Sequence, residues 1–242
     1  MGSTLPTNVL QLNAPHLGIT IPFTYFQNSH EHIVRILKGD TYPLVEGLGT
    51  VTSIVDIGAN VGAATVMLAL RYPDAVVHSF EPGPTPYELL SRNAAAIPRV
   101  QLHPYGLADS DRECKLYRST WDPMSASVLS SAENTGDFDT IRLRKASQAL
   151  REEAISSIDI LKVDTEGCEV PVLADLAELA KAARVIYLEY HSDADRRRID
   201  AMLEPSHVLA HAAARQPHRG DVCYVHRSTP YATAMAALAI HR

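Results

Sequence analysis

The sequence predicts a doubly wound α/β fold, with helices on both faces of a mostly parallel sheet and an antiparallel strand towards its C-terminal end. From Val51 onward, short apolar runs alternate with longer segments of helical character, which is typical of repeated strand–helix units. The apolar runs that end at Ile57 and Phe80 lead directly into polar turns. Ligands of such sheets bind where the strands end, so these turns indicate a binding site.

The first fifty residues are expected to form a flank or lid outside the sheet. Residues 17–23 read as a strand or one arm of a hairpin. Ser29 can cap a helix that ends at Gly39. The apolar residues of this helix share one face: Ile33, Ile36 and Leu37.

The remaining chain, residues 51–228, is predicted to be one nucleoside-binding domain, followed by a tail over 229–242 that forms a short helix or a frayed end. Strands are expected over residues 51–57, 75–81, 100–108, 158–163, 185–190, 207–214 and 221–227, with extra extended segments over 113–119 and 140–144. Helices are expected over 61–71, 84–97 and 193–203.

Composition excludes several classes of protein. The chain has 242 residues and 46% hydrophobic residues, which suits one ordinary globular domain with a short addition. Its net charge of −6 does not indicate the positively charged surface that nucleic-acid-binding proteins carry. No apolar stretch reaches membrane-spanning length and no signal peptide is visible, so we expect a cytoplasmic protein without a membrane partner. Three widely spaced cysteines argue against a disulfide framework.

The most informative stretches are Ile54-Val-Asp-Ile-Gly-Ala-Asn-Val-Gly62 and Ser79-Phe-Glu-Pro82. Glycines let the backbone turn tightly and let a ligand approach it. Glu81, at the end of the second strand, can accept hydrogen bonds from two ribose hydroxyls. Asp56 would repel a pyrophosphate but attract an ammonium group, directly or through water. A ligand with ribose, adenine and a cationic amino-acid tail is S-adenosylmethionine.

These motifs resemble those of the FkbM family of S-adenosylmethionine-dependent methyltransferases. The resemblance runs from about Val51 to about Ser228. It rests on Val55–Gly62, on Phe80–Pro84 with Asn93 downstream, on Asp159-Ile-Leu-Lys-Val-Asp-Thr-Glu-Gly-Cys-Glu169, and on Leu188–His191. The third block is the most specific. The resemblance implies a class I methyltransferase, Rossmann-like fold and methylation of a hydroxyl on a small molecule, such as a sugar, a polyketide or another secondary metabolite.

Alternatives remain open on the sequence alone. The acceptor atom could instead belong to an amine or a carboxyl group. A nicotinamide-dinucleotide oxidoreductase would need the G-x-G-x-x-G turn, which this chain lacks. A non-catalytic nucleoside-binding module would not need the polar residues that end the fourth and fifth strands. A homodimer is common among small-molecule methyltransferases and is a further expectation.

Strand position and the resemblance together assign five residues to the cofactor: Asp56, Gly58, Asn60, Gly62 and Glu81. Ala108 and Asp109 lie where residues of this fold usually contact the edge of the adenine ring. The run Ala-Asp-Ser-Asp also suits a simple turn. Asn93 lies on a helix and is expected to be structural.

Removal of a proton from a hydroxyl acceptor requires a base or a metal. Asp164 follows the fourth strand, and Glu189 and His191 end the fifth, so all three should meet at one pocket. His191 could be the base, oriented by a carboxylate. Alternatively, a divalent metal such as Mg²⁺ could be held by Asp164 with Glu189 or His191.

Neighbouring residues have more modest expected roles. Glu169 is expected to cap the helix after the fourth strand. A buried Lys162 requires an ion pair with a nearby carboxylate, or must reach out at the sheet edge. Four residues are candidates for contact with the acceptor. Trp121 and Met124 lie in an irregular loop, and Glu166 and Tyr42 are polar residues elsewhere in the chain.

Overall fold

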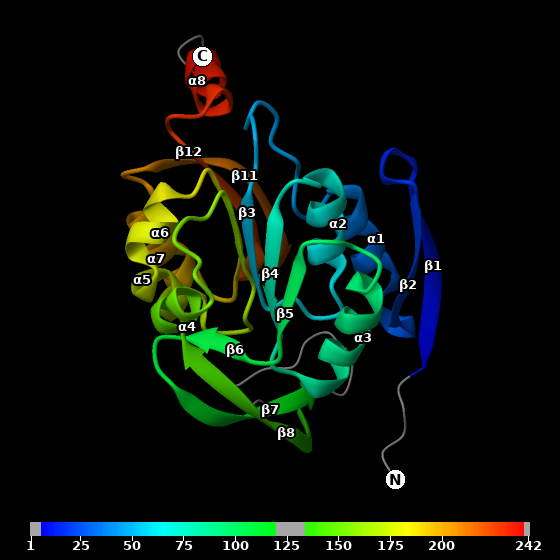
Figure 1. Cartoon of the computed structure of the whole chain (residues 1–242). Helices are drawn as coiled ribbons and strands as arrows, with labels where there is room; N and C mark the ends of the chain where they lie inside the picture. Colours follow the sequence, from blue (N-terminus) through cyan, green and yellow to red (C-terminus); the bar gives the residue numbers. More distant parts are fainter. Residues whose placement is uncertain (1–5, 120–133, 240–242) are drawn as a thin grey trace.

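The computed structural model describes residues 6–119 and 134–239, which contain a central sheet with the strand order β11-β12-β10-β9-β3-β4-β5 (Figure 1). Five strands run parallel, and β12 joins β10 antiparallel. This confirms the predicted fold class. The strands are β3 (Ser53–Ile57), β4 (Val76–Phe80), β5 (Val100–His103), β9 (Ile160–Val163), β10 (Val185–Tyr190), β11 (His207–Gln216) and β12 (Arg219–His226).

The helices form a layer on each face of this sheet, as Figure 1 shows. One layer contains α1 (His30–Lys38), α2 (Ala63–Arg71) and α3 (Pro84–Ala94). The other contains α4 (Ala146–Glu152), α5 (Glu169–Asp175), α6 (Ala177–Ala182) and α7 (Asp193–Leu203). Alternate residues of a strand therefore enter different cores: Val185 and Tyr187 pack on one side, and Ile186 and Leu188 on the other. Burial on both faces explains why these strands are continuous apolar runs.

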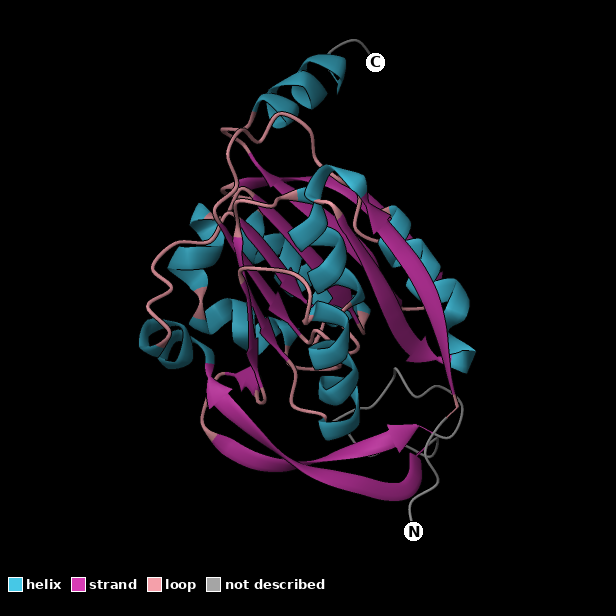
Figure 2. Cartoon of the chain, turned by 45° about the vertical axis from the view of Figure 1, so that its right-hand side comes forward, coloured by secondary structure: helices cyan, strands magenta, loops and turns pink. Residues whose placement is uncertain are grey.

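The predicted strand over 100–108 is wrong as a single element. Strand β5 ends at His103, and Pro104, which has no N–H to continue a ladder, follows it. The chain then enters a separate sheet with the order β6-β8-β7, formed by β6 (Gly106–Ala108), β7 (Arg112–Ser119) and β8 (Asn134–Lys145). Figures 1 and 2 both show this sheet across one end of the molecule.

The N-terminal flank is a hairpin of β1 (Thr7–Ala14) and β2 (Ile19–Phe26), joined through the short helix η1 (Pro15–Leu17) and followed by η2 (Gln27–Ser29). The two strands pair with each other as a separate sheet. Asn93 of α3 fastens the hairpin to the body. Its side chain accepts from the Thr24 N–H at 2.7 Å and donates to the carbonyls of Thr24 and Val61, each at 2.8 Å. The structural role expected of Asn93 is confirmed.

The tail forms α8 (Pro230–Ala239), which contacts β11 and β12 and lies at the end of the molecule opposite the three-stranded sheet (Figure 1). Within residues 6–119 and 134–239, none of the helices combines the length and apolar character that a membrane crossing requires.

We expect Asn93→Ala to lower the free energy of unfolding by about 2–4 kcal/mol, because it removes three hydrogen bonds and leaves buried backbone groups of Thr24 and Val61 without them. Urea unfolding measures this. The adjacent change Arg92→Ala breaks only an exposed ion pair with Glu88 and should cost less than about 0.5 kcal/mol. Equal effects of the two changes would contradict the anchoring role of Asn93.

Candidate active site

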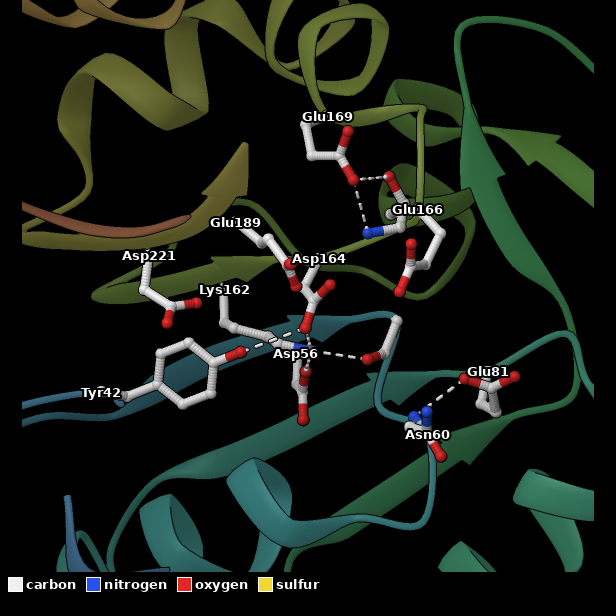
Figure 3. Close-up of polar contacts among 12 residues, drawn as sticks. Tyr42, Asp56, Asn60, Glu81, Lys162, Asp164, Glu166, Glu169, Glu189 and Asp221 are labelled. Atoms are coloured by element: carbon white, nitrogen blue, oxygen red, sulfur yellow. Dashed lines mark hydrogen bonds and ion pairs between the residues drawn. The ribbon is translucent and has the colours of Figure 1, made fainter. Parts of the chain in front are cut away.

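The carboxyl ends of β3, β4, β9 and β10 border a cavity of about 280 Å³. Its walls include Gly58 after β3, Glu81 after β4, Asp164 after β9 and Glu189 near the end of β10. In the sheet order, connections leave in opposite directions from β3 and β9, so the cavity lies at the topological switch point. Figure 3 shows Glu81 and Asn60 on one side of the site and Tyr42 and Asp221 on the other.

The loop after β3 is shaped by a close approach to β9. Gly58 has φ +79°, and a Cβ there would lie 1.7 Å from the carbonyl oxygen of Asp164, so only glycine fits. The N–H groups of Gly58 and Ala59 both donate to the Phe80 carbonyl, which ties the loop to β4. Asn60, at φ 51°, then directs its own N–H to Glu81.

Glu81 is a buried carboxyl held at the cavity wall. Its Oε2 accepts from the Asn60 N–H at 2.8 Å and its Oε1 accepts from the Gly83 N–H at 2.6 Å. Burial raises the pKa of Glu81 to about 7 even though both N–H groups favour the carboxylate. Glu81 therefore changes charge close to neutral pH.

Lys162 is the buried cation that connects the two halves of the site. Its Nζ donates to the Gly58 carbonyl at 2.5 Å and pairs with Asp56 at 3.1 Å and Asp164 at 3.6 Å. Burial alone would lower the pKa of Lys162, but the charges of Asp56 and Asp164 outweigh it and raise the pKa. The predicted ion pair of Lys162 is thus confirmed.

Asp56 was expected to contact the ammonium group of a ligand, but its position in the structure is different. It is fully buried, accepts from the Thr65 hydroxyl at 2.7 Å as well as pairing with Lys162, and does not line the cavity. A direct contact with a ligand ammonium group is therefore not supported. The short Asp side chain lies behind the loop, where it neutralises Lys162.

Asp164 and Glu189 are two neighbouring carboxyl groups in the cavity wall. Asp164 accepts from the Tyr42 hydroxyl at 3.1 Å. Burial and the charge of Asp164 raise the pKa of Glu189. Burial alone would also raise the pKa of Asp164, but Lys162 and a hydrogen bond from Glu189 hold it below its usual range. A hydrogen bond between two carboxyl groups requires one of them to carry a proton, so this pair shares one proton.

His191 lies behind this pair, between carboxylates. Its Nε2 is 3.0 Å from Glu166 and 3.6 Å from Glu189, and its Nδ1 is 3.5 Å from Glu169. Burial alone would lower the pKa of His191, but hydrogen bonds with Glu166 and Glu169 raise it to about 11. The imidazole is therefore protonated at neutral pH and does not line the cavity, which argues against His191 as the general base.

The structure brings together a different set of possible metal ligands from the set that the sequence predicted. Ligand atoms of Glu166, Glu189 and His191 lie within 4.8 Å of one another, without Asp164. However, His191 is held as a cation by these carboxylates, and Arg215 pairs with Glu189 at 2.6 Å. A divalent ion would have to displace the His191 proton and compete with Arg215. The contacts favour an ion-pair network over a metal centre.

The other predicted residues divide into three groups. Tyr42, Asn60 and Glu166 line the cavity. Gly62, at φ +89°, approaches Leu90 of α3, and its role is in packing. Trp121 and Met124 lie outside the described residues.

The two residues that were expected to contact the adenine lie outside the cavity wall. Ala108 is buried and Asp109 pairs with Arg112 at 2.7 Å on an exposed turn, and neither lines the cavity. The lining residues on this side come instead from the three-stranded sheet: Gly106, Leu107, Leu116, Ile141 and Leu143. This apolar wall depends on the separate sheet, which the linear strand pattern does not predict.

Glu169 has a structural role, but the expected helix cap is wrong: it is the first residue of α5, whose N-terminus has no side-chain cap, and it binds the preceding loop instead. Its Oε1 accepts from the N–H groups of Thr165 at 2.8 Å and Gly167 at 3.1 Å. Arg215 is the residue that sequence reasoning missed. It lines the cavity and pairs with Glu189 and Asp221, at 2.6 and 2.8 Å. One indication of this role is present in the sequence: Arg215 is a cation that directly follows the predicted strand 207–214, which is rich in small residues.

The strand order, the glycine loop after β3 and the acidic residue after β4 define the class I methyltransferase fold. Residues 56–215 match the sequence profile described as the Methyltransferase FkbM domain, so the chain belongs to the FkbM family of methyltransferases.

Relatives and solved structures agree with this assignment. The chain is 28% identical to 2-O-methyltransferase NoeI of Sinorhizobium fredii, over 57% of this chain and 62% of that protein. It is 24% identical to hexuronic acid methyltransferase AglP of Haloferax volcanii, over 61% of this chain and 59% of that protein. The chain thus spans about three fifths of these relatives' length. A fibrillarin pre-rRNA processing protein from Methanococcus jannaschii shares the fold alone, with a TM-score of 0.51, 10% identity, and coverage of 90% of this chain and 82% of that one.

We expect Lys162→Met to lower the free energy of unfolding by about 3–5 kcal/mol, because it leaves Asp56 as an uncompensated buried charge. Urea unfolding of the double variant Lys162→Met/Asp56→Asn should recover part of that loss. The control Lys181→Met removes only an exposed pair with Glu178 and should change stability by less than about 0.5 kcal/mol. A double variant no more stable than Lys162→Met would contradict the pairing.

Proposed function

We propose that this methyltransferase transfers the methyl group of S-adenosylmethionine to a hydroxyl group of a small molecule, such as a sugar, a polyketide or another secondary metabolite. One observation carries the proposal: a buried carboxyl suited to a ribose, Glu81, and a proton-sharing pair, Asp164 and Glu189, line the same cavity. The name of NoeI, which specifies 2-O-methylation, supports a hydroxyl acceptor, and the name of AglP, which specifies a hexuronic acid, supports a sugar as the acceptor molecule.

The cavity wall fits the chemical groups of S-adenosylmethionine. Glu81 offers a carboxylate to ribose hydroxyls, and Leu107 and Leu143 offer an apolar surface to adenine. Carboxyl groups outnumber cations around the cavity, which favours a positively charged ligand. When bound, the cofactor supplies an electrophilic methyl group on its sulfonium.

The pair at the acceptor end provides the base. Once the pair has released the proton that it shares, a hydroxyl that approaches Glu189 can donate its own proton to the Glu189 carboxylate as it attacks. The raised pKa of Glu189 makes this carboxylate the stronger base of the two. Tyr42 holds the other member, Asp164, from the opposite side. Because positioning supplies much of the rate of a methyl transfer, the rigid ion-pair surroundings contribute to catalysis as well.

This arrangement also discriminates between the alternatives. A carboxyl acceptor would meet Asp164, Glu166 and Glu189 and be repelled. An amine remains the nearest variant, because the same carboxylates would attract it. Expectations of a cytoplasmic location, a homodimer and no nucleic-acid partner stay predictions.

Binding of S-adenosylhomocysteine, the demethylated product, tests the cofactor half. Glu81→Ala should raise its Kd by at least about tenfold, because two charge-assisted hydrogen bonds are lost. Glu88→Gln, an exposed change on α3, is the control. Isothermal titration calorimetry measures both, with a nicotinamide dinucleotide as a negative ligand. Unchanged binding in Glu81→Ala would contradict the ribose role.

The affinity for S-adenosylhomocysteine in the same titrations should depend on pH. Hydrogen bonds from ribose favour the carboxylate of Glu81, whose pKa in the free protein is about 7. Binding therefore releases a proton near pH 7, and affinity should weaken as pH falls below 7 and level off above it. Titrations in buffers of different ionisation enthalpy detect the proton. The signature should be absent from Glu81→Gln.

Glu189→Gln should lower kcat by about 10²–10⁴-fold while leaving the Kd of S-adenosylhomocysteine within about twofold, because it removes the base and spares the cofactor end. The assay is transfer of a radiolabelled methyl group to a panel of methyl glycosides and hydroxylated macrolides, with amine and carboxyl analogues alongside. Transfer to amines alone would replace the hydroxyl proposal, and full activity of Glu189→Gln would exclude it as the base.

A further inference from the structure

Two carboxyl groups face each other across neighbouring strands at the acceptor end of the site. In the antiparallel pairing of β10 with β12, Glu189 is the direct partner of Asp221. Both residues are buried, at 8% and 1% exposure. Like charges directly opposite each other destabilise a sheet, so a cation must compensate this pair.

Arg215 supplies that cation from the next strand. Its Nη2 lies 2.6 Å from Oε2 of Glu189 and 2.8 Å from Oδ1 of Asp221. The other oxygen of Glu189, Oε1, faces His191 at 3.6 Å. The two carboxyl oxygens are thus fixed from two different elements, and Arg215 determines where one of them points.

The backbone of β11 is irregular at this residue. The pairing of β11 with β12 shifts register between Ala214, opposite Gly220, and Gln216, opposite Arg219. Arg215 is the residue left without a ladder partner. Bulges of this kind redirect a side chain and are frequent beside active sites. Here the redirected side chain enters the cavity wall next to Glu189.

We propose that Arg215 is a positioning residue for the methyl-transfer reaction: its guanidinium, shared with Asp221, fixes the carboxyl group of Glu189 towards the acceptor. The proposal rests on the proposed function of Glu189. Other charged or titratable groups around Glu189 come from the remaining elements of the site: Asp164, Glu166, His191 and Tyr42. None of these replaces Arg215, because Asp164 and Glu166 are acidic and the imidazolium of His191 is held by Glu166 and Glu169.

The test uses four variants: Arg215→Met, Arg215→Lys, Asp221→Asn and Arg215→Met/Asp221→Asn. Arg215→Met leaves two facing carboxyls and can lose stability for that reason alone. The double variant removes one of those charges, so it should recover folding without restoring the positioning. Arg198→Met, an exposed change on α7, is the matched control.

Crystal structures of these proteins with S-adenosylhomocysteine give a readout that needs no acceptor. We expect the Glu189 carboxyl to move by about 1 Å or more in the double variant and to keep its place in Arg215→Lys. In the methyl glycoside assay, kcat should fall about 10²-fold in the double variant, recover in part in Arg215→Lys, and leave KM for S-adenosylmethionine within about twofold.

A Glu189 carboxyl that stays in place in the double variant, or an unchanged kcat, would overturn the positioning role. Failure of the proposed function is distinguishable. In that case the wild-type protein would neither bind S-adenosylhomocysteine nor transfer methyl groups, and the position of Glu189 in ligand-free crystals would still decide whether Arg215 holds it.

Discussion

The site depends on one buried cation, Lys162. Its Nζ reaches the carboxylate of Asp56 in β3, the carbonyl of Gly58 in the loop after β3, and the carboxylate of Asp164 at the end of β9. These segments lie on either side of the switch point. A charge buried there is tolerable only if it is paired, so the requirement to satisfy Lys162 fixes both sides of the cavity at once.

A chain of compensated charges extends from Lys162 to the residues around Asp164 and Glu189. Asp164 contacts Lys162 and Tyr42, Glu189 contacts Arg215, and His191 lies among glutamates. Each buried charge has a counterpart on a different element, so the strands and the loop after β9 hold one another in place. Carboxyl groups still outnumber cations, and the excess is accommodated by a shared proton instead of a further cation.

Local patterns predicted most of the central sheet, because strands buried on both faces are continuous apolar runs and helices carry caps and one apolar face. They failed where a partner distant in the sequence decides the outcome. Pro104 indicates that β5 ends at His103, but nothing in residues 100–108 indicates that the chain then pairs with β8. In the site, the strand-end rule located Glu81, Asp164 and Glu189. It could not show that Asp56 faces inward to Lys162, that carboxylates hold His191 as a cation, or that Arg215 lies at a register shift.

The contact between Tyr42 and Asp164 shows that the site extends beyond the segment that defines the family. Residues 56–215 match the family profile and exclude both Tyr42 and Asp221, yet Tyr42 donates to Asp164 and Asp221 pairs with Arg215. The segment that the family profile matches is therefore smaller than the set of residues that build the site. A chain trimmed to that segment would lose both the hydroxyl that donates to Asp164 and the carboxyl that pairs with Arg215.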